Sequence, residues 1–217
     1  MGLDRIDQRE STNGSYNCTN TGTGVTAYII DTGIDARHVE FVGRATPGFD
    51  AINTGGKTDD CNGHGTHVAG TVGGTTYGVA KQVSLVAVRV LNCSGSGSTS
   101  QVIAGVDWVT GDYQAGAPAV ANMSLSSSGS RAMDNAVRAA PGMNITSATN
   151  GTFDTETATK SGTSMAAPHA AGVAALYLQG NPAASPTAVR DALFALTTKG
   201  IVTSSSTGNN HLLFTSY

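Results

Sequence analysis

The chain has 217 residues, of which 28 are glycine and 12% are charged, and its formal net charge is −3. This length can bury a sizeable core, and the composition is that of a globular protein, so we expect one compact domain spanning residues 1–217. The 12 Lys and Arg residues are scattered singly, which argues against a nucleic-acid partner. The chain lacks an apolar run as long as a membrane span, and its first ten residues lack the hydrophobic core of a secretion signal. We therefore expect no membrane partner and either a cytosolic chain or a processed mature form with an added Met1.

Short apolar runs predict buried strands over residues 25–31, 83–90 and 119–125. The first strand ends on Asp31. Between the second and third, residues 99–113 carry apolar residues at helical spacing, which predicts a helix with one apolar face made by Val102, Ile103, Val106 and Val109. A strand, a helix and a strand at this spacing predict a parallel crossover and an α/β fold.

Three further helices are predicted. The first follows His64, the second begins near Ser164 and covers residues 165–179 up to Gly180, and the third covers residues 185–196 with Pro186 at its start. The carboxyl ends of parallel strands lie at one edge of a sheet. The helices that follow these strands begin at the same edge, so their positive N-termini point toward it. We therefore expect Asp31, His64 and Ser164 to meet at that edge.

These three side chains are those needed to convert a weak hydroxyl into a nucleophile. In this interpretation His64 takes the proton of Ser164 during attack and returns it to the leaving amine. Asp31 holds the imidazole in the correct tautomer. Taken singly, each residue has an ordinary alternative as a capping aspartate, a surface histidine or one serine among many. The three together predict a serine hydrolase.

The sequences around them resemble the subtilase family of serine proteases (peptidase S8), in particular its proteinase K branch and aqualysin-like members. The resemblance rests on Y-I-I-D-T-G-I-D, D-C-N-G-H-G-T-H-V-A-G-T, V-L-N-C-S-G-S-G-S-T-S, A-V-A-N-M-S-L and S-G-T-S-M-A-A-P-H-A-A-G, and it covers nearly the whole chain. It implies a three-layer subtilisin-like α/β fold, with a mostly parallel central sheet and helices on both faces, in a truncated form.

The resemblance also implies a substrate cleft between two segments. Ser124, Leu125 and Ser126 match the strand that lines the pocket for the side chain before the scissile bond, and Gly95, Ser96 and Gly97 match the strand facing it. A polypeptide substrate would lie extended between them and add itself as a strand. The alternative for these segments is an ordinary strand end and a glycine loop.

Three cysteines, Cys18, Cys61 and Cys93, are too few for a disulfide scaffold or a four-cysteine zinc site. The residues alone allow three pairings, or three free thiols in a reducing compartment. The resemblance favours a bridge between Cys61 and Cys93, and with it an extracellular, secreted protein.

No cofactor is expected for the chemistry, but structural calcium is possible. Asp4, Asp7 and Gln8 match part of a calcium site in some relatives, and oxygen ligands suit that ion; a solvated N-terminal turn is the alternative. Asp59 and Asp60 are a weaker calcium candidate.

His64 and His67 have the spacing of a metal pair on a helix, but the sequence offers no third ligand cluster, so we expect His67 to be a packing residue.

The resemblance breaks between Ala140 and Pro141. There the family would complete a helix and continue through a strand whose terminal Asn donates a hydrogen bond to the oxyanion. Asn144 and Asn150 align with a later strand, so this role is not transferred to either. The loss of one such donor costs on the order of 10² to 10³ in turnover, as measured for a subtilisin.

The sequence thus predicts a serine endopeptidase that acts on polypeptides through an acyl-enzyme, as a monomer or a small homo-oligomer. The alternative is a catalytically impaired subtilase-fold protein that binds peptides without cleaving them. A third hypothesis is an esterase, because esters need less help at the leaving group than amides do.

Overall fold

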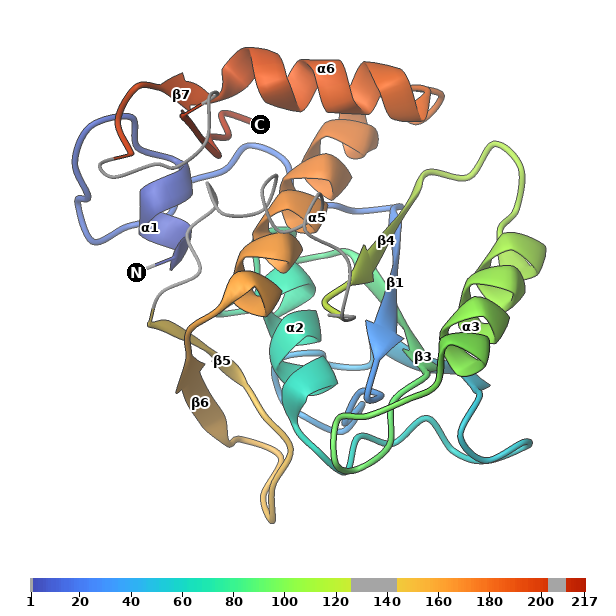
Figure 1. The fold of residues 1–217 in the computed structure, drawn as a ribbon. Coiled ribbons are helices and arrows are strands. Elements are labelled where there is room, and N and C mark those ends of the chain that lie inside the picture. Colours follow the sequence, from blue (N-terminus) through green and yellow to red (C-terminus); the bar gives the residue numbers. More distant parts are fainter. Residues whose placement is uncertain (1, 126–143, 203–209) are drawn as a thin grey trace.

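The computed structural model describes residues 2–125, 144–202 and 210–217. At its centre is a parallel four-stranded sheet in the order β2-β3-β1-β4 (Figure 1). The strands are β1 (Thr26–Asp31), β2 (Ala45–Asp50), β3 (Ser84–Arg89) and β4 (Ala119–Met123). Since β1 is central, its carboxyl end at Asp31 lies in the middle of the sheet edge where a site is expected.

Five helices and two small antiparallel sheets surround this sheet in the described residues. The helices are α1 (Gly2–Ile6), α2 (His64–Gly73), α3 (Thr99–Asp112), α5 (Thr163–Gly180) and α6 (Pro186–Leu196). The small sheets pair β5 (Ile145–Ala148) with β6 (Thr157–Lys160), and β7 (Thr198–Lys199) with β8 (His211–Leu212).

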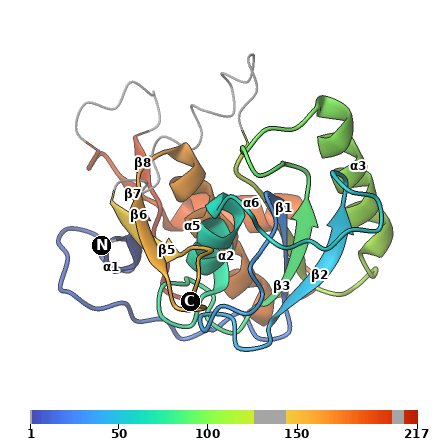
Figure 2. The same cartoon turned by 90° about the horizontal axis from the view of Figure 1, so that it is seen from below.

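Alternation along β1 divides the core into two layers. Ala27 and Ile29 face a large cluster that includes Val68 of α2 and Leu176 of α5. Tyr28 and Ile30 face the other side, where residues of α3 cover them. Successive strand side chains point to opposite faces, so a strand that is apolar throughout must be covered on both. Figure 2 accordingly shows α3 on one side of β1 and β3 and the pair α2 and α5 on the other.

The helix starts have identifiable local causes. Ser98 caps α3, accepting a hydrogen bond from the N–H of Gln101, whose side chain accepts one from the N–H of Ser98 in return. Ser185 caps α6 by accepting a single hydrogen bond from the N–H of Ala188, and Pro186 occupies the first turn, where its missing N–H costs nothing. The first turn of α2 approaches the turn after β1 so closely that a Cβ on Gly65 would overlap the carbonyl of Gly33.

The predicted α/β fold with a parallel sheet between helical layers is confirmed, and the predicted helices and strands are present with ends shifted by at most two residues. The predicted inner face of α3 was wrong in part. Ile103 and Val106 are exposed at 54% and 37%. Gly105 is buried instead and contacts the sheet together with Val102, Trp108 and Val109. Because the small Gly105 lets the helix axis approach the strands, the face centred on it turns inward.

Among the described residues, no helix has both the length and the apolar character needed to cross a membrane.

Candidate active site

Asp31 and His64 form a direct hydrogen bond at the carboxyl edge of the sheet. Asp31 is the last residue of β1 and is fully buried, and its Oδ1 lies 2.7 Å from Nδ1 of His64, the first residue of α2. The same oxygen accepts the N–H of Thr32 at 2.7 Å. Since a carboxylate only accepts, the proton of the imidazole lies on Nδ1, and Nε2 is left able to accept a proton.

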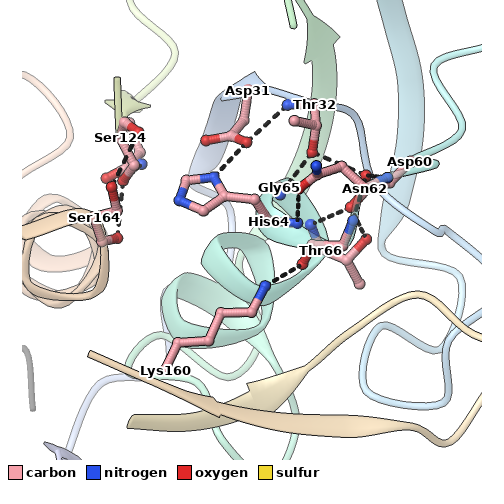
Figure 3. Close-up of polar contacts among 12 residues, drawn as sticks. Asp31, Thr32, Asp60, Asn62, His64, Gly65, Thr66, Ser124, Lys160 and Ser164 are labelled. Atoms are coloured by element: carbon pink, nitrogen blue, oxygen red, sulfur yellow. Dashed lines mark hydrogen bonds and ion pairs between the residues drawn. The ribbon is translucent and has the colours of Figure 1, made fainter. Parts of the chain in front are cut away.

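Ser164 lies in the first turn of α5, on the other side of the imidazole from Asp31 (Figure 3). Its hydroxyl donates to the carbonyl of Ser124 at 3.3 Å, and the hydroxyl of Ser124 donates to the carbonyl of Ser164 at 3.1 Å. Within the described residues its hydroxyl makes no hydrogen bond to His64. Both residues nevertheless line one cavity of about 550 Å³. Catalytic hydrogen bonds are often long or misaligned in the absence of substrate, so the absence of this contact does not exclude a Ser164–His64 pair.

The walls of this cavity are largely the predicted substrate-binding residues. Gly95, Ser96 and Gly97 line it, as do Ser124 and Leu125, with Asn62, Leu91 and Ser94 completing the lining. Ser126 lies outside the described residues. The Asn92 side chain fixes the first wall, because its Oδ1 accepts the N–H groups of Ser94 and Ser96.

Among the described residues that line the cavity, the N–H of Ser164 is the candidate donor for a developing oxyanion. The N–H of Ser164 belongs to the first turn of α5, where N–H groups lack intrahelical partners and the helix dipole is positive. The amide of Asn62 also lines the cavity, but its Nδ2 donates to the carbonyl of Cys93 at 2.9 Å. Neither Asn144 nor Asn150 is part of the lining, and Nδ2 of Asn150 donates to the carbonyl of Asp60.

A disulfide joins Cys61 to Cys93, and Cys18 is free and half-buried. The predicted pairing is therefore confirmed. The bridge connects the loop that leads into α2 with the loop that carries Gly95–Gly97, so it links His64 to the first wall of the cavity. The guanidinium of Arg89 lies beside the bridge, with Nη2 at 3.2 Å from Sγ of Cys61, and pairs with Asp50.

The N-terminal calcium prediction finds limited support. Both carboxylate oxygens of Asp4 accept backbone N–H groups, from Asn13 and Gly14. Oδ2 of Asp7 accepts the N–H of Asn17, while its Oδ1 is buried without a hydrogen-bond partner in the described part of the chain. The carbonyl of Gln8 accepts from Arg5. These residues fit a cation only at Asp7, and the described residues contain no group of three or more His, Cys, Asp or Glu side chains that could hold a metal ion.

His67 is a packing residue, as expected. It is fully buried, and its Nε2 lies 3.1 Å from the carbonyls of Ile145 and Ala158, which join α2 to the β5–β6 hairpin. Burial, and secondarily the charge of Lys160, lowers the pKa of His67 to about 4.

Three polar residues beside the site have contacts that the sequence did not predict: Thr32 and Lys160 were not singled out, and Asp60 was considered only as a calcium ligand. Thr32 and Asp60 form a buried hydrogen-bond network beside the N-terminus of α2. Lys160, at the end of β6, places Nζ 3.3 Å from the carbonyl of Gly63; burial lowers its pKa, against which the charges of Asp60 and Asp31 act. Asp60 stands four residues before His64 in the loop that leads into α2. This position in the sequence could have indicated that Asp60 supports His64. The network also occupies both oxygens of Asp60, which argues against the weaker calcium candidate there.

Comparisons with known proteins agree with this geometry. The model of the subtilase family matches residues 22–152 and 139–213. The chain is 46% identical to an extracellular serine proteinase of Thermus sp. (strain Rt41A), over 98% of this chain and 65% of that protein. It is 44% identical to alkaline serine exoprotease A of Vibrio alginolyticus, over 98% of this chain and 49% of that protein. The crystal structure of a cold adapted subtilisin-like serine proteinase superposes with a TM-score of 0.90 at 41% identity, covering 100% of this chain and 98% of the other.

The chain therefore spans less than two thirds of the length of these two relatives. The alignment with the Thermus proteinase extends over 268 positions, more than the 217 residues present, so part of that relative has no counterpart here. The family model matches the chain in two pieces that overlap at residues 139–152. This break in the match agrees with the predicted truncation after Ala140. With its fold, its motifs and these relatives in agreement, the chain belongs to the subtilase family.

Proposed function

We propose that this chain is a serine endopeptidase in which Ser164 is the nucleophile, His64 the general base and acid, and Asp31 the group that orients His64. The observation that carries the proposal is the 2.7 Å Asp31–His64 hydrogen bond, with His64 and Ser164 lining the same cavity. The names of the two relatives, a serine proteinase and a serine exoprotease, support the same class of reaction.

The reaction follows from these positions. Oγ of Ser164 attacks the scissile carbonyl carbon while its proton passes to Nε2 of His64, and the carbonyl oxygen becomes an oxyanion near the N–H of Ser164. The imidazolium then gives its proton to the leaving amine as the C–N bond breaks, which leaves an acyl-enzyme. Water repeats the cycle: His64 takes its proton, the hydroxide attacks the ester, and Ser164 recovers its hydrogen.

The substrate is an extended polypeptide lying between Gly95–Gly97 and the segment of Ser124 and Leu125, held by main-chain hydrogen bonds. The described lining of the cavity contains no Asp, Glu, Lys or Arg, which argues against a strict preference for a charged substrate side chain. With one fixed oxyanion donor among the described residues, turnover is expected to be slower than in relatives with two by on the order of 10² to 10³.

The setting of the protein is part of the proposal. The disulfide and the extracellular Thermus relative support secretion as a processed mature chain. We also propose that residues 1–217 form a single catalytic domain, monomeric or in a small homo-oligomer, that needs no cofactor for chemistry. Structural calcium would bind at Oδ1 of Asp7, and loss of calcium-dependent thermal protection in Asp7→Asn is the test of that site.

Casein hydrolysis by the wild type and by Ser164→Ala tests the function. Activity in the wild type and its loss in the variant are expected, and equal activities would refute the assignment of Ser164. Rates on a matched ester and amide of one peptide separate the alternatives. An endopeptidase cleaves both, an esterase cleaves only the ester, and a peptide-binding protein binds both without cleaving either.

A further inference from the structure

Asp60 is buried beneath the active site and accepts five hydrogen bonds. Only 7% of the surface of Asp60 is exposed to solvent. Oδ1 accepts the hydroxyl of Thr32 at 2.9 Å and the N–H groups of Asn62 and Gly63 at 2.8 and 2.9 Å. Oδ2 accepts the N–H and the hydroxyl of Thr66 at 2.9 and 2.7 Å. Every lone-pair direction of this carboxylate is therefore committed to a protein donor.

These donors enclose His64 on both sides along the chain. Asn62 and Gly63 precede it, Thr66 follows it in the first turn of α2, and Gly63 has a left-handed φ of 94°. A carboxylate at the N-terminus of a helix also interacts favourably with the helix dipole. Asp60 thus fixes the backbone from which the imidazole projects, although the two side chains are not themselves hydrogen-bonded in the described structure.

Thr32 connects Asp60 to Asp31, the hydrogen-bond partner of His64. It directly follows Asp31, its N–H donates to Oδ1 of Asp31, and its hydroxyl donates to Asp60 while accepting the N–H of Gly65 at 2.9 Å. Through this one side chain the carboxyl end of β1 and the N-terminus of α2 share a buried acceptor (Figure 3). The Asp31–His64 distance depends on these two segments holding their relative position.

We propose that Asp60, acting through Thr32, is a positioning residue that sets the Asp31–His64 geometry. The expected effect on kcat rests on the proposed function. The expected effect on the Asp31–His64 geometry does not. An asparagine at position 60 has a single acceptor oxygen. In either orientation its amide group faces donors, so at most three of the five hydrogen bonds survive and the loop gains freedom to shift. Misplacement of a catalytic group by about 1 Å costs on the order of a hundredfold in rate.

The test compares Asp60→Asn with Asp59→Asn, its matched control. Asp59 is the exposed neighbouring carboxylate, so both variants lose one negative charge from the same loop. A second pair is Thr32→Val, which removes the bridging hydroxyl at nearly constant volume, and Thr32→Ser, which keeps it. For each variant we would measure kcat and KM on a short peptide amide, thermal unfolding, and the downfield NMR signal of the Nδ1 proton of His64.

We expect Asp60→Asn and Thr32→Val to lower kcat by about 10- to 100-fold with KM within about twofold. The Nδ1 proton signal should shift or broaden in both, while Asp59→Asn and Thr32→Ser retain the wild-type signal and rate. An unchanged kcat and proton signal in folded Asp60→Asn would overturn the positioning role. Equal losses in Asp59→Asn would overturn it too, because they would assign the effect to net charge. A wild-type chain that cleaves no peptide would contradict the proposed function instead, and the proton signal would still decide the positioning role.

Discussion

At the scale of single residues, the site depends on the burial of Asp31. A fully buried carboxylate that accepts both His64 and the N–H of Thr32 has its charge fixed in place before substrate arrives. Removing the charge but keeping the shape tests this arrangement. Because an asparagine can present its amide to Nδ1 and favour the wrong tautomer, Asp31→Asn should lower kcat by about 10⁴ while the far-UV circular dichroism spectrum stays unchanged. A folded variant within about tenfold of wild type would contradict the role of Asp31.

Two buried histidines make the stability of the fold depend on pH. Burial lowers the pKa of His67 and of His169 to about 4, compared with about 6.5 in the unfolded chain. The unfolded state binds protons first as the pH falls, so stability is fully present above about 6.5 and is lost down to about pH 4.

Unfolding free energies measured from pH 7 to pH 4 should therefore decrease by on the order of 1–3 kcal/mol for each histidine. His67→Gln keeps a donor for the carbonyls of Ile145 and Ala158 but does not titrate in this range, so its curve should be flatter than that of the wild type. A wild-type curve that is flat between these pH values would show that the buried histidines are not linked to folding.

At the scale of elements, small residues decide how closely helices approach the sheet. A Cβ on Gly105 of α3 would overlap Val90, while one on Gly111 of the same helix meets nothing within 4 Å. The two positions therefore differ in packing but share the same backbone conformation and the same gain in helix propensity.

Alanine at these two glycines should have opposite effects. Gly105→Ala should destabilise the fold by about 1–3 kcal/mol, because the helix has to move away from β3. Gly111→Ala should be neutral or stabilising by up to about 1 kcal/mol. Chemical denaturation of both variants measures the difference. Equal effects would mean that α3 does not pack against the sheet at Gly105.

Some helices and strands could be predicted from the sequence and others could not. The strands β1 and β3 were predictable because they are continuous apolar runs, and α5 because its small apolar residues precede a glycine stop. β2 was missed because Pro47 and Gly48 interrupt it at an irregularity of the sheet register. A strand near β5 was implied only by the resemblance, and β6 was missed because its residues are polar and alternate between exposed and half-buried. Long, uniformly buried elements carry a periodic signal that edge elements lack.

The site was predictable to a similar extent. Asp31, His64, Ser164 and the cavity walls stand in long motifs, so their convergence could be predicted. The five hydrogen bonds of Asp60 could not be, since its donors come from two separate segments and an Asp pair in a loop looks like a solvated or cation-binding site. Likewise, the hydrogen bond from Ser164 to the carbonyl of Ser124 depends on a rotamer, which a sequence does not specify.

At the scale of the whole molecule, the disulfide and the sheet together hold the cavity. The bridge closes a separation of 32 residues between the loop before α2 and the loop after β3. Replacing both cysteines, Cys61→Ser with Cys93→Ser, should lower the free energy of unfolding by about 2–4 kcal/mol, mainly by freeing the unfolded chain. Cys18→Ser is the matched control; Cys18 forms no bridge but packs against the core, so this change should lower stability by clearly less than the double replacement. A double variant as stable as this control would show that the bridge does not constrain the chain.

The central claim is that the pair Asp31–His64 activates the hydroxyl of Ser164. The most direct measurement is labelling of the wild-type protein with a fluorophosphonate probe, followed by peptide mapping, alongside His64→Ala. We expect the label on Ser164 of the wild type, at a rate that falls by orders of magnitude in the variant. A label on another residue, no label at all, or equal rates in the two proteins would contradict the account.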